Sequence, residues 1–179
     1  MAFQRFCDIF PDLGIAETRD ITLIQAEYGL PAGSYGFIEQ FCNDSHCDCR
    51  RVIFSVYMKG REEPIAAIGW GWESREFYAN WMKWEADPAE IDRCKGPELN
   101  PLSPQSEWAE GALRLCRDVL IQDPAYVERV KGHYRLFRER IDRGYVPQGL
   151  SQAARERKKK QVSAAAKKAQ KAARKRNRR

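Results

Sequence analysis

The sequence predicts an α+β fold: an antiparallel β-meander of three to four strands with a Cys-rich zinc-binding hairpin, packed on three to four C-terminal helices and followed by a basic tail. Runs rich in β-branched and aromatic residues occupy the first half of the chain. Apolar residues at helical spacing follow in the second half, behind proline and aspartate start signals. Lysine and arginine then accumulate at the C-terminus.

The length and composition predict one domain with an appendage. The chain has 179 residues, 43% of them apolar, and single domains cluster at roughly 100 to 150 residues. We therefore expect a zinc-stabilised globular domain over residues 1–150. Residues 151–179 are Lys/Arg/Ala-rich and form no apolar face, so we expect this tail to be disordered or a fraying helix.

The first half of the chain predicts mostly strands. A short amphipathic helical segment is expected before Pro11, because Phe3, Phe6 and Phe10 recur at helical spacing. From Tyr35 to Cys42, the residues Tyr35, Phe37, Glu39 and Phe41 alternate with Gly36, Ile38, Gln40 and Cys42, as is typical of a strand. The expected strands cover residues 18–25, 35–42, 52–58 and 65–72.

The second half predicts helices. Asp87-Pro88 and Asp123-Pro124 each place an aspartate at a helix cap and a proline at the first helical position. Gly96 and Gly144 then mark helix ends. The expected helices cover residues 77–84, 88–95, 104–121 and 124–142.

Three cysteines between the second and third of these strands predict a metal site. Cys42, Cys47 and Cys49 are spaced Cys-x4-Cys-x-Cys, so a hairpin that ends on Cys42 and restarts after Cys49 brings the thiols together. Thiolates are soft donors that bind zinc tetrahedrally. The first residues show no secretory pattern, so we expect a cytoplasmic protein with reduced cysteines, in which zinc is favoured over disulfide bonds. Reduced thiols in a polar turn, or a redox pair at Cys47 and Cys49, are the alternatives.

Three residues are candidates for the fourth metal ligand. His133 is favoured because it lies on the inward face of the last helix, and a ligand from there would tie helix to sheet. His46 is nearest in sequence but adjacent to Cys47, and Cys94 is the third candidate. Four protein ligands would indicate a structural site, whereas three ligands and a water are typical of catalysis.

The charge is divided sharply along the chain. Residues 151–179 hold 13 basic residues and one acid, Glu156, for a net charge of +12, while residues 1–150 hold 18 basic and 24 acidic residues, a net −6. Such a tail predicts contact with the phosphates of RNA or DNA. The expected contact residues are Arg155, Arg157, Lys158, Lys159, Lys160, Lys167, Lys168, Lys171, Arg174, Lys175, Arg176, Arg178 and Arg179.

The function predicted from these features is binding rather than catalysis. The nucleotide-binding glycine motifs, the Gly-x-Ser-x-Gly elbow and the His-Glu-x-x-His metal motif are all missing from the sequence, as is any run of about 20 apolar residues. We therefore expect a small zinc-binding module associated with nucleic acid or ribonucleoprotein. A protein-interaction domain of unknown partner and a zinc enzyme with an open coordination position are the alternatives.

Overall fold

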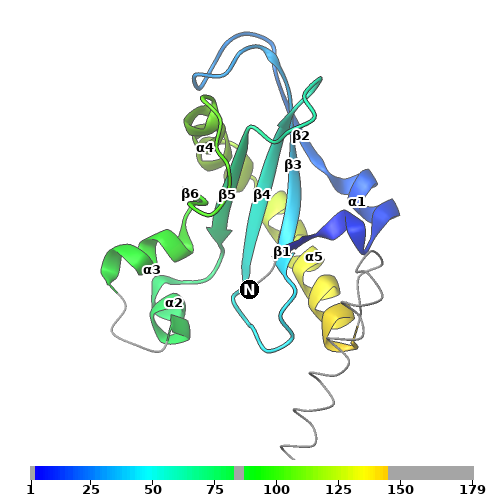
Figure 1. The fold of residues 1–179 in the computed structure, drawn as a ribbon, viewed down its shortest axis with the longest axis vertical. Helices are drawn as coiled ribbons and strands as arrows, with labels where there is room; N and C mark the ends of the chain where they lie inside the picture. The colour runs from blue at the N-terminus through cyan, green and yellow to red at the C-terminus, as the bar shows by residue number, and fades with distance from the viewer. Residues whose placement is uncertain (1–2, 83–86, 145–179) are drawn as a thin grey trace, which may run out of the picture. The chain divides into compact units, whose positions relative to one another are not determined.

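The computed structural model describes residues 3–82 and 87–144, which form an antiparallel sheet and five α-helices (Figure 1). The strands are β1 (Phe3–Arg5), β2 (Arg19–Leu23), β3 (Gly33–Cys42), β4 (Arg51–Met58), β5 (Ala66–Gly71) and β6 (Glu98–Leu99). The helices are α1 (Pro11–Glu17), α2 (Arg75–Met82), α3 (Pro88–Lys95), α4 (Ala109–Asp118) and α5 (Pro124–Asp142), with short 3-10 turns at Phe6–Asp8 and Leu120–Gln122.

The sheet is built around β3. Its order is β1-β3-β4-β5-β6, and β2 also pairs with β3. The two short strands share the outer edge of β3, because β1 pairs with its end (Phe3 opposite Cys42) and β2 with its start (Leu23 opposite Gly33). The predicted meander is confirmed in β3, β4 and β5, the predicted strand at residues 18–25 is β2, and the described residues add β1 and β6.

Alternation along β3 decides what faces the core. Tyr35, Phe37, Glu39 and Phe41 are buried, while the residues between them are half-buried. Opposite them, β4 places Phe54 across from Glu39 and buries it completely. A carboxylate therefore projects into an aromatic core, where it requires a hydrogen-bonded partner.

Helices lie beside both edges of the sheet and cover one of its faces. In Figure 1, α1 lies on the β1–β2 side, and α2 and α3 lie together on the β5–β6 side. The long helix α5 contacts β3 and supplies buried Tyr126, Val130 and Phe137 to the core. Asp123 caps its first turn by accepting hydrogen bonds from the amides of Ala125 and Tyr126, as the sequence signal predicts.

The N-terminal prediction is wrong in detail. The segment before Pro11 forms a strand and a 3-10 turn, and the helix begins at Pro11 itself. The aromatic spacing has another cause: Phe6 stacks on Phe10 and meets Phe41 edge to face, so these rings cover the end of β3. Proline at a first helical position is favourable because its missing N–H is unpaired there anyway.

Helix α4 begins later than predicted. The sequence favours a start near Pro104, whereas the structure starts it at Ala109. The intervening residues pair with the edge of the sheet instead: Ser106 donates both its amide and its hydroxyl to the carbonyl of Ile65, and Gln105 bonds to the backbone of Ala67. Tertiary hydrogen bonds thus override local helix propensity here.

Contacts divide the chain into two units, Met1–Gly144 and Tyr145–Arg179. The predicted tail, with all 13 of its expected contact residues, and the predicted domain boundary at residue 150 lie outside the described residues. Among the described helices, none is both long and apolar enough to cross a bilayer.

Candidate metal centre and adjoining cleft

Three thiols converge at the connection between β3 and β4. Cys42 ends β3, Cys49 precedes β4, and the turn between them carries Cys47. The three Sγ atoms lie within 4.8 Å of one another and can hold a metal ion. Cys42 and Cys49 are buried and Cys47 is half-buried. The hairpin therefore brings together the three cysteines that the sequence singled out.

Local hydrogen bonds shape the turn. The Asp44 carboxylate accepts from the amide of His46 at 2.9 Å, and the Asp44 carbonyl accepts from the amide of Cys47 at 3.1 Å. A side-chain-closed turn of this kind is typical of aspartate. Arg50 follows Cys49 with φ of 46°, a left-handed conformation that redirects the chain into β4.

The three thiols differ in acidity. The hydrogen bond from the Cys49 thiol lowers the pKa of Cys42 to about 6, against the opposing effect of burial. The same hydrogen bond raises the pKa of Cys49, and burial further favours its protonated form. Burial is also the largest cause that raises the pKa of Cys47, followed by the neighbouring Cys42 charge. Cys42 is therefore the thiol of the cluster that ionises most readily, and a cation that binds there displaces thiol protons.

Helix α5 anchors this loop from the other side. The Arg138 guanidinium donates to the carbonyls of Cys42 at 3.2 Å and Asp44 at 2.8 Å, and it also pairs with Asp142. One turn earlier, the Tyr134 hydroxyl donates to Asp48 at 3.1 Å. The loop is therefore held by the protein through residues far away in sequence, so its thiols are positioned before any ion binds.

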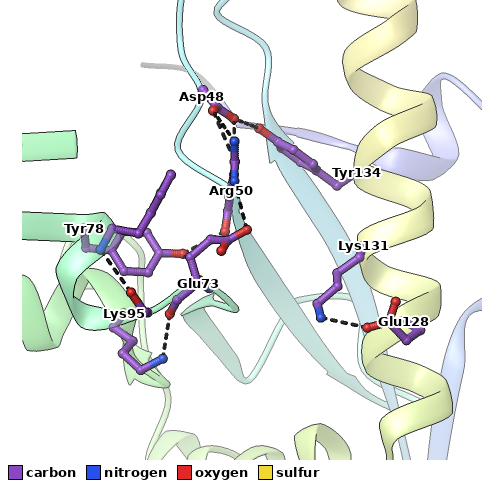
Figure 2. A network of polar contacts seen from close by, with 10 residues as sticks. Asp48, Arg50, Glu73, Tyr78, Lys95, Glu128, Lys131 and Tyr134 are labelled. Atoms are coloured by element: carbon purple, nitrogen blue, oxygen red, sulfur yellow. Dashed lines mark hydrogen bonds and ion pairs between the residues drawn. The ribbon is translucent and has the colours of Figure 1, made fainter. Parts of the chain in front are cut away.

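A polar chain continues from the loop toward α2 and α3 (Figure 2). Arg50 lies between two carboxylates, 3.0 Å from Asp48 and 3.2 Å from Glu73. The Glu73 carbonyl accepts from the Lys95 ammonium at 2.8 Å. The buried Tyr78 hydroxyl donates to the Arg50 carbonyl at 2.9 Å. These contacts connect the end of the loop, just before β4, with the segment after β5 and with α2 and α3.

His133 does not lie in the thiol cluster. Its Nδ1 is 2.8 Å from Glu39 and its Nε2 is 3.1 Å from Glu17, so carboxylates occupy both ring nitrogens. The ring also stacks on Phe6 with centroids 4.3 Å apart. The prediction that His133 points into the core is confirmed, but the structure differs from the expectation of a metal ligand, because the buried Glu39 takes the imidazole as its partner.

The other two candidates for the fourth ligand are also outside the cluster. His46 is adjacent to the thiols, yet its side chain is 94% exposed and is oriented toward Ser45 and Asp44. Cys94 is buried on α3 in an apolar cluster with Tyr78 and Ile91. Within residues 3–82 and 87–144, the cluster thus consists of three thiols without a fourth donor at the same spacing.

Sequence reasoning missed the residues that support these sites. Glu39 carried a signal, since it stands between Phe37 and Phe41 on the inward face of a strand where a charge is costly. Glu17 and Arg138 carried none, because their partners are 116 and 96 residues away along the chain.

A cleft of about 680 Å³ opens beside the thiol loop. Residues of the loop, Trp72 and Glu73 after β5, and one face of α5 line it. The half-buried Trp72 ring meets the Tyr134 ring edge to face with centroids 5.0 Å apart, which gives the cleft an aromatic wall. Cys47 belongs to the same lining, so the cleft and the thiol cluster are adjacent.

Comparison with protein-family models, with curated proteins and with solved structures finds no match to this chain.

Proposed function

We propose that this chain is a zinc-binding module that associates with nucleic acid or ribonucleoprotein. The convergence of Cys42, Cys47 and Cys49 carries the proposal. Zn–S bonds of about 2.3 Å place the sulfurs of a tetrahedral site roughly 3.8 Å apart. Thiols already within 4.8 Å of one another reach that geometry by small movements. An all-sulfur donor set favours zinc over magnesium or calcium, which prefer oxygen.

The proposed role of the metal is to fix the β3–β4 connection. The loop bears Asp44 and Asp48, which hold its turn and its contacts with Arg50 and Tyr134. A bound dication with three thiolates leaves one negative charge, and the nearby Arg138 guanidinium offsets it. The basic segment 151–179 supplies most of the phosphate affinity by release of counterions, because the body carries a net charge of −6.

Metal content tests the first half of this proposal. Purified protein should contain about one zinc per chain, and X-ray absorption should report sulfur neighbours at about 2.3 Å. Cys42→Ser, Cys47→Ser and Cys49→Ser should each lose the ion and melt at lower temperature. Cys7→Ser is the matched control, since Cys7 lies outside the cluster. Metal-free protein with an unchanged melting temperature contradicts the proposal.

A salt titration tests the second half. Binding of the full chain to an arbitrary RNA or DNA should weaken with a log-log slope of about −0.7 to −0.9 per phosphate contacted. Deletion of residues 151–179 should remove most of the affinity and most of the slope. Unchanged affinity and slope after deletion would mean that the tail is not the contact surface, and the nucleic-acid role would lose its main support. If neither the full chain nor the truncated chain binds, a protein-interaction domain is favoured.

The adjacent cleft supports a second candidate, a zinc centre with one open coordination position. Within the described residues the cluster supplies three ligands, and Cys47 lines the cleft. Three protein ligands and a water are typical of catalytic zinc. Cobalt substitution separates the two candidates: an anion such as azide that shifts the cobalt spectrum indicates an open position, and an unchanged spectrum indicates a closed structural site.

A further inference from the structure

We propose that the cleft beside the thiol loop binds a nucleotide unit, with the base against Trp72 and the phosphate at Lys131 and Arg135. The inference rests on the proposed nucleic-acid role and names the site on the body where one nucleotide is received. Three features of the cleft carry it: its size, its aromatic wall and its unequal charge.

The size and the wall suit a base. At about 680 Å³ the cleft falls within the roughly 300 to 1,000 Å³ of small-ligand sites. Trp72 is half-buried in the lining, and Tyr134 supports its ring from the side at 5.0 Å. Any of the nucleic-acid bases can stack on such a supported ring, because every base presents a π-face.

The charge of the lining leaves two cations without an acid in the cleft. Four basic residues and three acids line it. Arg50 binds two of the acids, and Arg138 binds the third, Asp142. Lys131 and Arg135 are therefore the two basic residues that have no acidic partner within the cleft lining.

These two cations lie one helical turn apart. Positions i and i+4 share a face of α5, and Arg138 continues that face at i+7. Lys131 contacts Glu128 at 2.7 Å, outside the cleft lining, but both side chains are solvent-accessible and a screened pair of this kind is weak. Figure 2 shows Lys131 and its partner on α5, across from the Arg50 network. Among the described residues, Arg135 has no ion pair within 4.0 Å. A phosphate can therefore be bound at this face without breaking the Arg50 or Arg138 pairs.

The test uses the zinc-loaded full chain and adenosine monophosphate as the probe. The indole N–H resonance of Trp72, identified by its loss in Trp72→Leu, should shift and saturate as the nucleotide is added. Lys131→Ala/Arg135→Ala should weaken binding about tenfold or more. Lys59→Ala/Arg117→Ala removes the same charge at exposed sites outside the cleft lining and should change binding by less than about twofold. Trp72→Leu should weaken binding about fivefold or more, the fold-change that corresponds to about 1 kcal/mol of stacking.

Further probes identify which part of the ligand is recognised. Inorganic phosphate and adenosine should each bind more weakly than adenosine monophosphate. A single-stranded RNA decamer that binds far more tightly than the monophosphate, and still depends on Arg135, identifies a strand as the source of the nucleotide. Equal affinity for the two identifies a free nucleotide.

Three results would overturn the proposal: no saturable shift of the Trp72 resonance, equal losses in the cleft variant and its charge-matched control, or tighter binding of hexaglutamate than of nucleotides. The last would assign the cleft to an acidic peptide. All three are independent of the tail deletion, whose failure affects only the proposed nucleic-acid role.

Discussion

Replacement of His133 by alanine separates two roles of this residue, the buried partner of two carboxylates and a ligand of the metal ion. His133 is 4% exposed, and its imidazole connects Glu39 of β3, which is 7% exposed, with Glu17 of α1. Loss of one partner of a buried ion pair costs about 3–5 kcal/mol, because the other charge stays buried. The Tyr126 hydroxyl continues to donate to Glu39 in the variant, so we expect the low end, about 3 kcal/mol. For a chain of this size that corresponds to a melting temperature lower by about 6–12 °C.

The stability that His133 contributes to the fold depends on pH, and the sign of this dependence follows from its contacts. Burial disfavours the charged imidazole, but the hydrogen bonds and charges of Glu39 and Glu17 outweigh it and raise the pKa of His133. Tyr126 and Arg129 are the other titratable groups at this network, through Glu39 and Glu17 respectively. A raised pKa stabilises the fold fully below the unfolded value of about 6.5, and this stabilisation is lost as the pH rises through the folded value. Relative to Glu39→Gln/His133→Gln, the wild type should therefore lose stability as the pH rises from about 6.5 through the raised pKa of His133.

Denaturant unfolding with parallel zinc analysis measures both effects. His133→Ala should be destabilised at neutral pH yet retain the proposed zinc ion while folded. His46→Ala is the control: its side chain is 94% exposed, so we expect a change within about 0.5 kcal/mol. A cost for His133→Ala below about 1 kcal/mol would refute the buried-pair argument. Loss of zinc from the folded variant would instead make His133 a ligand.

Further variants test the supports of the metal loop and the sheet. Arg138→Ala should lower zinc affinity about tenfold or more without removing a ligand, measured by competition with a chelator, because the guanidinium holds the carbonyls of Cys42 and Asp44; unchanged affinity would contradict the proposed anchoring. Gly71→Ala should destabilise the fold by about 1–3 kcal/mol, measured by thermal unfolding, since the new methyl group would overlap the fully buried Tyr78 ring; a cost near zero would mean that this ring moves freely.

The sequence alone determined the elements whose signals are local. Alternation in residues 35–42 predicted β3, and the caps at Asp87 and Asp123 predicted where α3 and α5 begin, because a period or a capping oxygen acts within a few residues. The thiol cluster was predictable for the same reason, since a hairpin brings its own two ends together.

The tertiary structure decided everything that depends on residues distant in the chain. The contact of His133 with carboxylates instead of the thiol cluster rests on Glu39, 94 residues away, and Glu17, 116 residues away. The late start of α4 rests on hydrogen bonds from Ser106 to Ile65. Periodicity correctly placed His133 toward the core, but it carries no information on which buried charged group the imidazole contacts there. That choice is made by packing, because a buried carboxylate must find a partner within hydrogen-bond reach and only the folded chain determines which one it is.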